Sequence, residues 1–156
     1  MSKSQIVSIV DDDASVRAAM QSLVRSLGFV AFVFESAESF LRSPRVDDSS
    51  CLITDVQMPG MSGLDLRDCL IALGSRIPII FITAFPEDII RRRAQAGALG
   101  FLEKPFAGRT MIELVRQALA IQSCWSRRVS SGGKIPLEFD ELTKEDCWLK
   151  SWSAFA

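Results

Sequence analysis

Five short apolar runs alternate with segments of helical periodicity over the first 121 residues. The runs lie at residues 6–10, 29–34, 51–55, 77–82 and 99–102. They are apolar almost throughout, rather than alternating with polar residues, which is typical of strands buried on both faces of a parallel sheet. The segments after them carry apolar residues at helical spacing, most strongly over residues 108–121. The pattern therefore predicts five repeats of a strand followed by a helix.

Start and stop signals mark several of the predicted helices. The first helix is expected to end before Gly28, because glycine commonly follows a helix C-terminus. Ser36 is expected to cap a short second helix, and Pro86 suits the first turn of a helix that closes at Gly97. The polar segment 45–50 is predicted to be a loop.

This repeat predicts an α/β fold in which helices cover both faces of a parallel sheet. Right-handed crossovers leave few topologies, and the natural one for five units is a doubly wound, flavodoxin-like sheet with the strand order 2-1-3-4-5. In that order the first strand lies directly beside the third. Residues that follow these two strands are therefore expected to share a crevice at the carboxyl edge of the sheet.

Three carboxylates are expected in that crevice. Asp11 and Asp12 follow the first strand, and Asp55 ends the third. Thr83 and Lys104 arrive from the fourth and fifth strands. Like charges at this distance repel unless one group is protonated or a cation joins them. Oxygen ligands without sulfur or imidazole favour a hard cation, so the sequence predicts a Mg²⁺ site.

The candidate metal ligands are not equivalent. Asp12 and Asp55 are the expected direct ligands, and Asp11 acts directly or through a water molecule. The backbone carbonyl of Gln57 is a further candidate, because the chain turns beside Asp55. For the acidic run as a whole the alternative is a helix N-terminus that the dipole favours, and Asp13 is the best candidate for such a cap.

A metal ion, an ammonium group and a hydroxyl around one carboxylate form a receptor for a phosphoryl group. Transfer of that group needs neutralised charge and an in-line nucleophile more than it needs acid–base residues. Asp55 can be the nucleophile and form an aspartyl phosphate. The chain contains no histidine, but the leaving group of the phosphodonor can belong to another protein.

Four motifs resemble the receiver domain of two-component response regulators, in the branch that nitrogen-fixation regulators exemplify. In chain order they are VDD at 10–12, TDVQMPGMSG at 54–63, ITA at 82–84 and EKPF at 103–106. The resemblance covers residues 4–121. It implies a bacterial signalling protein that is not an enzyme, apart from slow loss of its own phosphoryl group, and whose phosphodonor is a histidine kinase or a phosphotransfer protein.

The resemblance also implies roles for single residues. Asp55 would be the phosphoacceptor, Asp11 and Asp12 the acidic pair that holds Mg²⁺, and Lys104 the partner of the phosphate, with a cis bond to the proline that follows it. Thr83 would be the switch hydroxyl. Phe101 matches the aromatic switch position, where a phenylalanine has no hydroxyl with which to hydrogen bond.

The resemblance places the signalling surface on the face formed by the helix at 86–97, the strand at 99–102 and the helix at 108–121. Four arginines on this face are candidates for contacts with a downstream protein: Arg91, Arg92, Arg93 and Arg109. For the run at 91–93 a solvated helix face is favoured over a nucleic-acid patch, because no tryptophan or tyrosine lies among these arginines to stack on bases.

Composition bounds the remaining possibilities. The chain has 156 residues, 48% of them hydrophobic, and a net charge of −1, which gives no general attraction to nucleic acid or anionic membranes. No apolar run approaches the roughly 20 residues that span a bilayer, and no signal-peptide pattern begins the chain. The four cysteines are scattered without a CxxC spacing, so a reducing cytoplasm is the expected location.

We expect a receiver domain at 1–121, followed by a linker and short tail at 122–156. The tail carries five basic and five acidic residues and lacks room for a complete output domain, so direct DNA binding is not expected. Its aromatic residues at 143–155 fit one face of an amphipathic helix, which can pack on its own receiver, on a second copy in a homodimer or on a partner. A remnant of an output domain and a disordered tail are alternatives.

Two other functions compete with the phosphoacceptor. A pseudo-receiver would bind partners without accepting phosphate, although all the acceptor residues are present. A Mg²⁺-dependent phosphatase with an aspartate nucleophile would normally carry a second acid two positions after the first, and residue 57 is glutamine.

Overall fold

The computed structural model describes residues 5–84 and 100–130, although not the side chains of residues 122–130. Its five parallel strands form one sheet in the order β2-β1-β3-β4-β5, which confirms the predicted doubly wound topology. The strands are β1 (Ile6–Val10), β2 (Val30–Phe34), β3 (Cys51–Asp55), β4 (Ile79–Thr83) and β5 (Gly100–Glu103). Three of them, β1, β3 and β4, are buried at every position, as their continuously apolar sequences predict.

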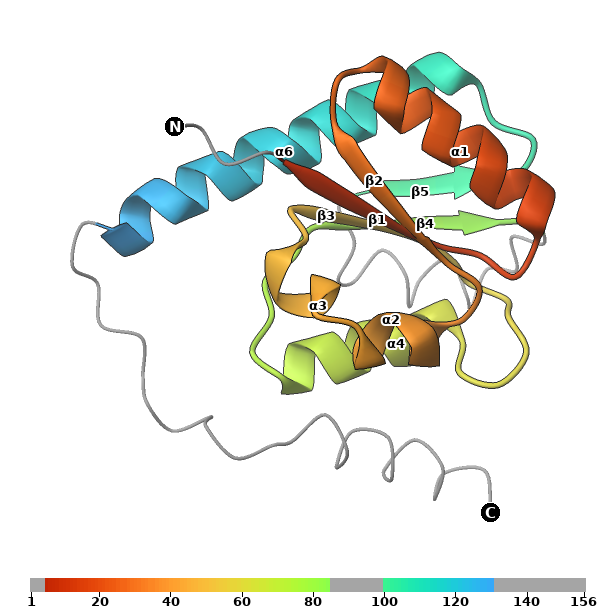
Figure 1. Cartoon of the computed structure of the whole chain (residues 1–156), viewed down its shortest axis with the longest axis horizontal. Coiled ribbons are helices and arrows are strands. Elements are labelled where there is room, and N and C mark those ends of the chain that lie inside the picture. Colours follow the sequence, from red (N-terminus) through yellow and green to blue (C-terminus); the bar gives the residue numbers. More distant parts are fainter. Residues whose placement is uncertain (1–4, 85–99, 131–156) are drawn as a thin grey trace.

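Helices cover both faces of this sheet (Figure 1). The described helices are α1 (Ala14–Ser26), α2 (Ala37–Arg42), α3 (Arg45–Asp48), α4 (Gly63–Ala72) and α6 (Gly108–Ser130). Figure 1 shows α1 and α6 on one side of the sheet and α2, α3 and α4 on the other. The predicted stop at Gly28 is confirmed, since this glycine has φ +89° just after α1.

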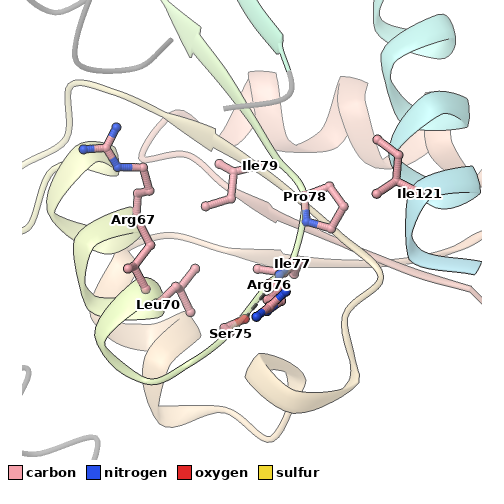
Figure 2. A pocket seen from close by; sticks show the side chains of 9 residues that line it. Arg67, Leu70, Ser75, Arg76, Ile77, Pro78, Ile79 and Ile121 are labelled. Atoms are coloured by element: carbon pink, nitrogen blue, oxygen red, sulfur yellow. Dashed lines mark hydrogen bonds between the residues drawn. The ribbon is translucent and has the colours of Figure 1, made fainter. Parts of the chain in front are cut away.

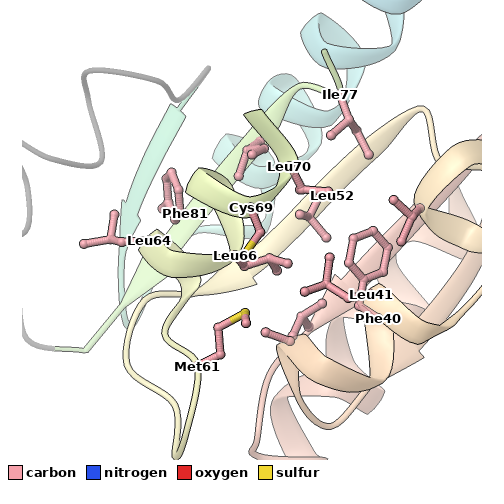
Figure 3. Close-up of a cluster of buried hydrophobic side chains, with 14 of the residues drawn as sticks. Phe40, Leu41, Leu52, Met61, Leu64, Leu66, Cys69, Leu70, Ile77 and Phe81 are labelled. Atoms are coloured by element: carbon pink, nitrogen blue, oxygen red, sulfur yellow. The ribbon is translucent and has the colours of Figure 1, made fainter. Parts of the chain in front are cut away.

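The core is divided by the sheet into two layers. The layer under α2 and α4 is drawn in Figure 3, and its buried side chains include Phe40 of α2, Leu52 of β3 and Phe81 of β4. All three are fully buried. Removing each from water contributes about 1.5–3 kcal/mol to folding. This layer fixes α4 against β3 and β4 and therefore fixes the position of the turn that follows Asp55.

The strand register brings the carboxyl ends of the strands to one edge. Val10 pairs with Thr54, so the acids that follow β1 lie beside Asp55, which in turn pairs with Ile82. On the far side of β4, the backbone N–H of Lys104 donates to the carbonyl oxygen of Thr83 at 2.7 Å. The expected convergence of strands one, three, four and five is therefore observed.

The segment 45–50 was expected to be a loop, and this prediction is wrong. It contains the one-turn helix α3, which buries Val46 in the core. Arg45 forms an ion pair with Asp48 at 3.2 Å, and its guanidinium carbon lies 4.5 Å from the centre of the Phe32 ring. A single turn held by tertiary contacts is too short to show helical periodicity.

The last helix also differs from its predicted bounds. The apolar pattern ends at residue 121, but α6 continues to Ser130. Residues 122–130 contain no glycine or proline, so nothing in the sequence ends the helix there, and Gly132 and Gly133 are the first breakers. The helix predicted at 86–97 and the tail helix at 143–155 lie outside the described residues.

Candidate functional site

Three carboxylates meet at the carboxyl edge of the sheet. Oxygen atoms of Asp11, Asp12 and Asp55 all lie within 4.8 Å of one another. Asp11 is fully buried and Asp55 is 6% exposed, whereas Asp12 is exposed to solvent. The cluster forms because β1 and β3 are neighbours in the sheet, although their last residues, Val10 and Asp55, are 45 positions apart in the sequence.

Lys104 supplies the positive charge of this site. Its Nζ lies 3.1 Å from Oδ2 of Asp11 and 3.2 Å from Oδ2 of Asp55. The peptide bond between Lys104 and Pro105 is cis, as the family resemblance implied. Burial by itself lowers the pKa of Lys104, but its hydrogen bond to Asp11 and the charges of both acids outweigh this, so the pKa is raised overall.

Asp55 is held in an environment that opposes its ionisation. Burial is the largest cause and raises the pKa of Asp55; the charge of Lys104 lowers it, and the charge of Asp11 raises it again, leaving a net rise. Three carboxylates face one ammonium group, so the fully ionised site has an excess of two negative charges. Its donor atoms are all oxygens, and a hard divalent cation such as Mg²⁺ fits both the donors and this charge.

The other predicted site residues lie around this cluster. The backbone N–H of Gln57 donates to Oδ1 of Asp55 at 3.1 Å, while its side chain is exposed. Thr83 ends β4 and is fully buried. Phe101 on β5 is half-buried and packs against the core layer under α2 and α4. Asp13 caps α1, with Oδ1 accepting from the N–H of Ser15 at 2.8 Å.

Of the four arginines predicted to form a signalling surface, only Arg109 is described. It is exposed near the start of α6. Arg91, Arg92 and Arg93 lie outside the described residues. Cys51 and Cys69 are buried free thiols. Burial raises the pKa of the Cys51 thiol to about 12, so it is not a reactive nucleophile.

Three residues near the site were missed by the sequence analysis. Arg17 donates from Nη1 to the carbonyl oxygen of Asp11 at 2.7 Å. Gly63 lies so close to Asp55 that a Cβ atom would come within 2.2 Å of the Asp55 carbonyl oxygen. Glu38 accepts a hydrogen bond from the backbone of Met61. The glycine was visible in the motif after β3, but no local pattern identifies the other two.

A separate hollow lies at the opposite end of β4. It has a volume of about 280 Å³ and is lined by α4, the turn before β4 and the end of the apolar stripe of α6 (Figure 2). Its polar side chains include Arg67 and Arg76, and it contains no carboxylate. The hollow is therefore not part of the acidic site.

Comparisons with known proteins agree with this geometry. Residues 7–116 match the family described as "Response regulator receiver domain". The chain is 37% identical over 142 residues to response regulator protein TmoT of Ectopseudomonas mendocina, covering 90% of this chain and 64% of TmoT. It is 38% identical over 120 residues to the transcriptional regulatory protein FixJ of Azorhizobium caulinodans, covering 76% of this chain and 57% of FixJ.

Among solved structures, the response regulator StyR superposes with a TM-score of 0.75 at 37% identity. The match covers 83% of this chain and 66% of StyR. Of TmoT, the matched relative named above, this chain covers less than two thirds of the length.

The fold is a flavodoxin-like α/β domain with a cluster of three carboxylates at the carboxyl edge of its sheet. The chain belongs to the response regulator receiver domain family of two-component signalling. Receiver domains bind Mg²⁺ at an acidic pocket, and here Asp11, Asp12 and Asp55 form such a cluster. Within the described residues, no helix is long and apolar enough to cross a bilayer.

Proposed function

We propose that the protein is a phosphorylation switch in which Asp55 accepts a phosphoryl group from a histidine kinase or a phosphotransfer protein. The observation that carries this proposal is the position of Asp55, with an ammonium nitrogen 3.2 Å from its carboxylate and two further acids within 4.8 Å. Membership of the receiver family supports it. In the transfer, a carboxylate oxygen of Asp55 forms a bond to phosphorus, the bond from phosphorus to the donor imidazole breaks, and the imidazole leaves with that electron pair.

The neighbouring residues have distinct proposed roles. Asp11, Asp12, Asp55 and the backbone carbonyl of Gln57 hold Mg²⁺, which neutralises charge on the transferred group. The charge of Lys104 favours the ionised form of Asp55 before transfer, and Lys104 pairs with a phosphoryl oxygen afterwards.

Thr83 and Phe101 are proposed to transmit the change. The hydroxyl of Thr83, at the end of the strand between Asp55 and Lys104, donates a hydrogen bond to a phosphoryl oxygen. Movement of Thr83 leaves space that Phe101 of the adjacent strand can enter, since Phe81 pairs with Phe101 and Thr83 with Glu103. The output is proposed to be a protein contact that includes Arg109, made by a downstream partner or by a second copy.

The proposal is tested by exposing the full chain to Mg²⁺ and acetyl phosphate and measuring the intact mass. We expect a gain of one phosphoryl group that is absent in Asp55→Asn and absent when Mg²⁺ is chelated. Binding of a beryllofluoride mimic, followed by ¹⁹F NMR, gives a second readout. Turnover of phosphomonoesters would instead support a phosphatase, and a protein that forms neither adduct would be a pseudo-receiver.

A further inference from the structure

The loop between β3 and α4 borders the phosphoacceptor. Its two ends are fixed, because the N–H of Gly63 donates to the carbonyl oxygen of Val56 at 3.0 Å and the N–H of Val56 donates to Ile82 at 2.9 Å. Between these ends the chain carries Gln57, whose N–H donates to Asp55. Because the loop is short and closed at both ends, we expect backbone motion in its middle to reach Gln57, whose N–H contacts Asp55.

One side chain from another element holds the middle of the loop. Oε1 of Glu38 accepts a hydrogen bond from the N–H of Met61 at 3.0 Å, across 23 residues of sequence. Glu38 lies in the first turn of α2, which Ser36 caps by accepting from the N–H of Ser39. The hydrogen bond is charge-assisted, which makes it stronger than a neutral one.

The loop backbone is shaped to admit this carboxylate. Gly60 has φ +79°, a conformation that side chains disfavour, and a Cβ atom there would lie 2.9 Å from Oε1 of Glu38. Met61 itself is 6% exposed and packs in the core layer under α2 and α4. The contact thus joins a capped helix, packed on the core, to the backbone of a loop whose Met61 side chain is buried in the same layer.

We propose that Glu38 is a positioning residue for the phosphorylation site: it holds the loop 57–62 so that the backbone of Gln57 faces Asp55 and the bound cation. This inference rests on the proposed function, because it assigns Glu38 a role in the binding of Mg²⁺ and phosphate that Asp55 carries out. Residues that orient metal ligands from outside commonly affect metal affinity about 10- to 100-fold, and Glu38 acts through a backbone rather than through a ligand side chain. We therefore expect the lower end of that range, about tenfold.

Three substitutions separate the hydrogen bond from the charge. Glu38→Ala removes both, and Glu38→Gln removes the charge but keeps an oxygen that can accept from Met61. Glu38→Asp keeps the charge but is one methylene too short to reach. The matched control is Glu35→Ala, an exposed carboxylate just after β2 on the same edge of the sheet.

Two measurements on the full chain test the proposal. Amide hydrogen exchange of Met61 and Gln57, measured by NMR without metal, reports the loop directly, and calorimetric titration with Mg²⁺ reports the site. We expect Glu38→Ala and Glu38→Asp to speed Met61 exchange and to weaken Mg²⁺ binding about tenfold. Glu38→Gln should stay within about twofold of the parent, since it keeps the hydrogen bond. Glu35→Ala should leave both measurements unchanged.

Parent-like exchange and affinity in Glu38→Ala would overturn the proposal. So would equal weakening of binding by Glu38→Ala, Glu38→Gln and Glu35→Ala, because it would show that only the negative charge of the edge matters. A parent protein that bound no Mg²⁺ would overturn the proposed function and the positioning role with it. Failure of the positioning role alone is distinguishable from this outcome. In that case the parent would still bind Mg²⁺, and Glu38→Ala would bind it with parent-like affinity.

Discussion

Nζ of Lys104 lies 3.2 Å from Oδ2 of Asp55, although β4 separates the strands from which these two residues come. The same nitrogen also contacts Asp11, at 3.1 Å. One ammonium group therefore joins the ends of β1, β3 and β5 at the carboxyl edge of the sheet. It neutralises one of three negative charges, and this shortage of positive charge governs how the metal-free site responds to mutation and to pH.

Removing that ammonium group should destabilise the metal-free protein. In Lys104→Met the carboxylates of Asp11 and Asp55 lose their only described cationic partner, and breaking such a pair costs about 3–5 kcal/mol when both groups are buried. Lys104 is 20% exposed at its side chain, so we expect about 2 kcal/mol near neutral pH. Chemical denaturation in EDTA measures this loss.

Arg109→Met is the control for Lys104→Met, because it removes one positive charge from an exposed position near the start of α6. It should change stability by less than about 0.5 kcal/mol. Equal losses in the two variants would mean that the net charge of the protein, and not the contact with Asp55, stabilises the fold.

The raised pKa of Asp55 makes its ionisation unfavourable for folding. The folded state holds the proton more tightly than the unfolded chain, where the ordinary pKa is 3.8, so Asp55 costs stability as pH rises from that value through the raised pKa. We expect Asp55→Asn to match the parent in strong acid and to become progressively more stable than the parent above about pH 4. Denaturation of both proteins in EDTA across the pH range measures the difference.

Asp47→Asn is the comparison, because it also removes a carboxylate, from an exposed position on α3 away from the cluster. If the stability advantage of Asp55→Asn shrank with rising pH, the pKa of Asp55 would be lowered in the folded protein and not raised. Saturating Mg²⁺ should reverse the ranking, because only the parent keeps the full set of ligands and gains stability from binding.

The close approach of α4 to Asp55 predicts a large effect of one methyl group. In Gly63→Ala the added Cβ would lie 2.2 Å from the carbonyl oxygen of Asp55 and 3.2 Å from Cα of Val56, and both neighbours are backbone. Relieving this clash requires α4 to move, so we expect the free energy of unfolding to fall by about 1–3 kcal/mol, as measured by thermal unfolding. Gly108→Ala, where no atom lies within 4 Å of the new Cβ, should be neutral or stabilising. Similar losses at both positions would contradict the steric explanation.

Asp13 tests the distinction between a helix cap and a metal ligand. Its Oδ1 accepts from the N–H groups of Ser15 and Val16, so Asp13→Ala should cost about 1 kcal/mol of stability. Asp13→Ser should recover most of this loss, because serine is also a good cap. Titration with Mg²⁺ should give parent-like affinity for Asp13→Ala and much weaker binding for Asp12→Ala. Weakened binding in Asp13→Ala and Asp13→Ser alike would place Asp13 among the ligands.

The sequence by itself determined the fold and most of the acidic site. Continuously apolar strands alternating with helices leave few sheet orders, and the natural one for five units places the residues after β1 beside Asp55. The proposed chemistry rests on the residue types at those strand ends. The sheet order and the clustering of the three acids could be predicted because burial and periodicity are local signals, and because topology alone places the end of a strand.

Only the tertiary structure decided how the loops around the site are held. The contact of Glu38 with Met61, the approach of Gly63 to Asp55 and the single turn of α3 depend on the paths of irregular backbone, which carry no periodic signal. The sharing of one ammonium group between Asp11 and Asp55, at 3.1 Å and 3.2 Å, likewise depends on the relative positions of three strand ends. These positions are fixed by the packing of the whole core, and no single segment of the chain determines them.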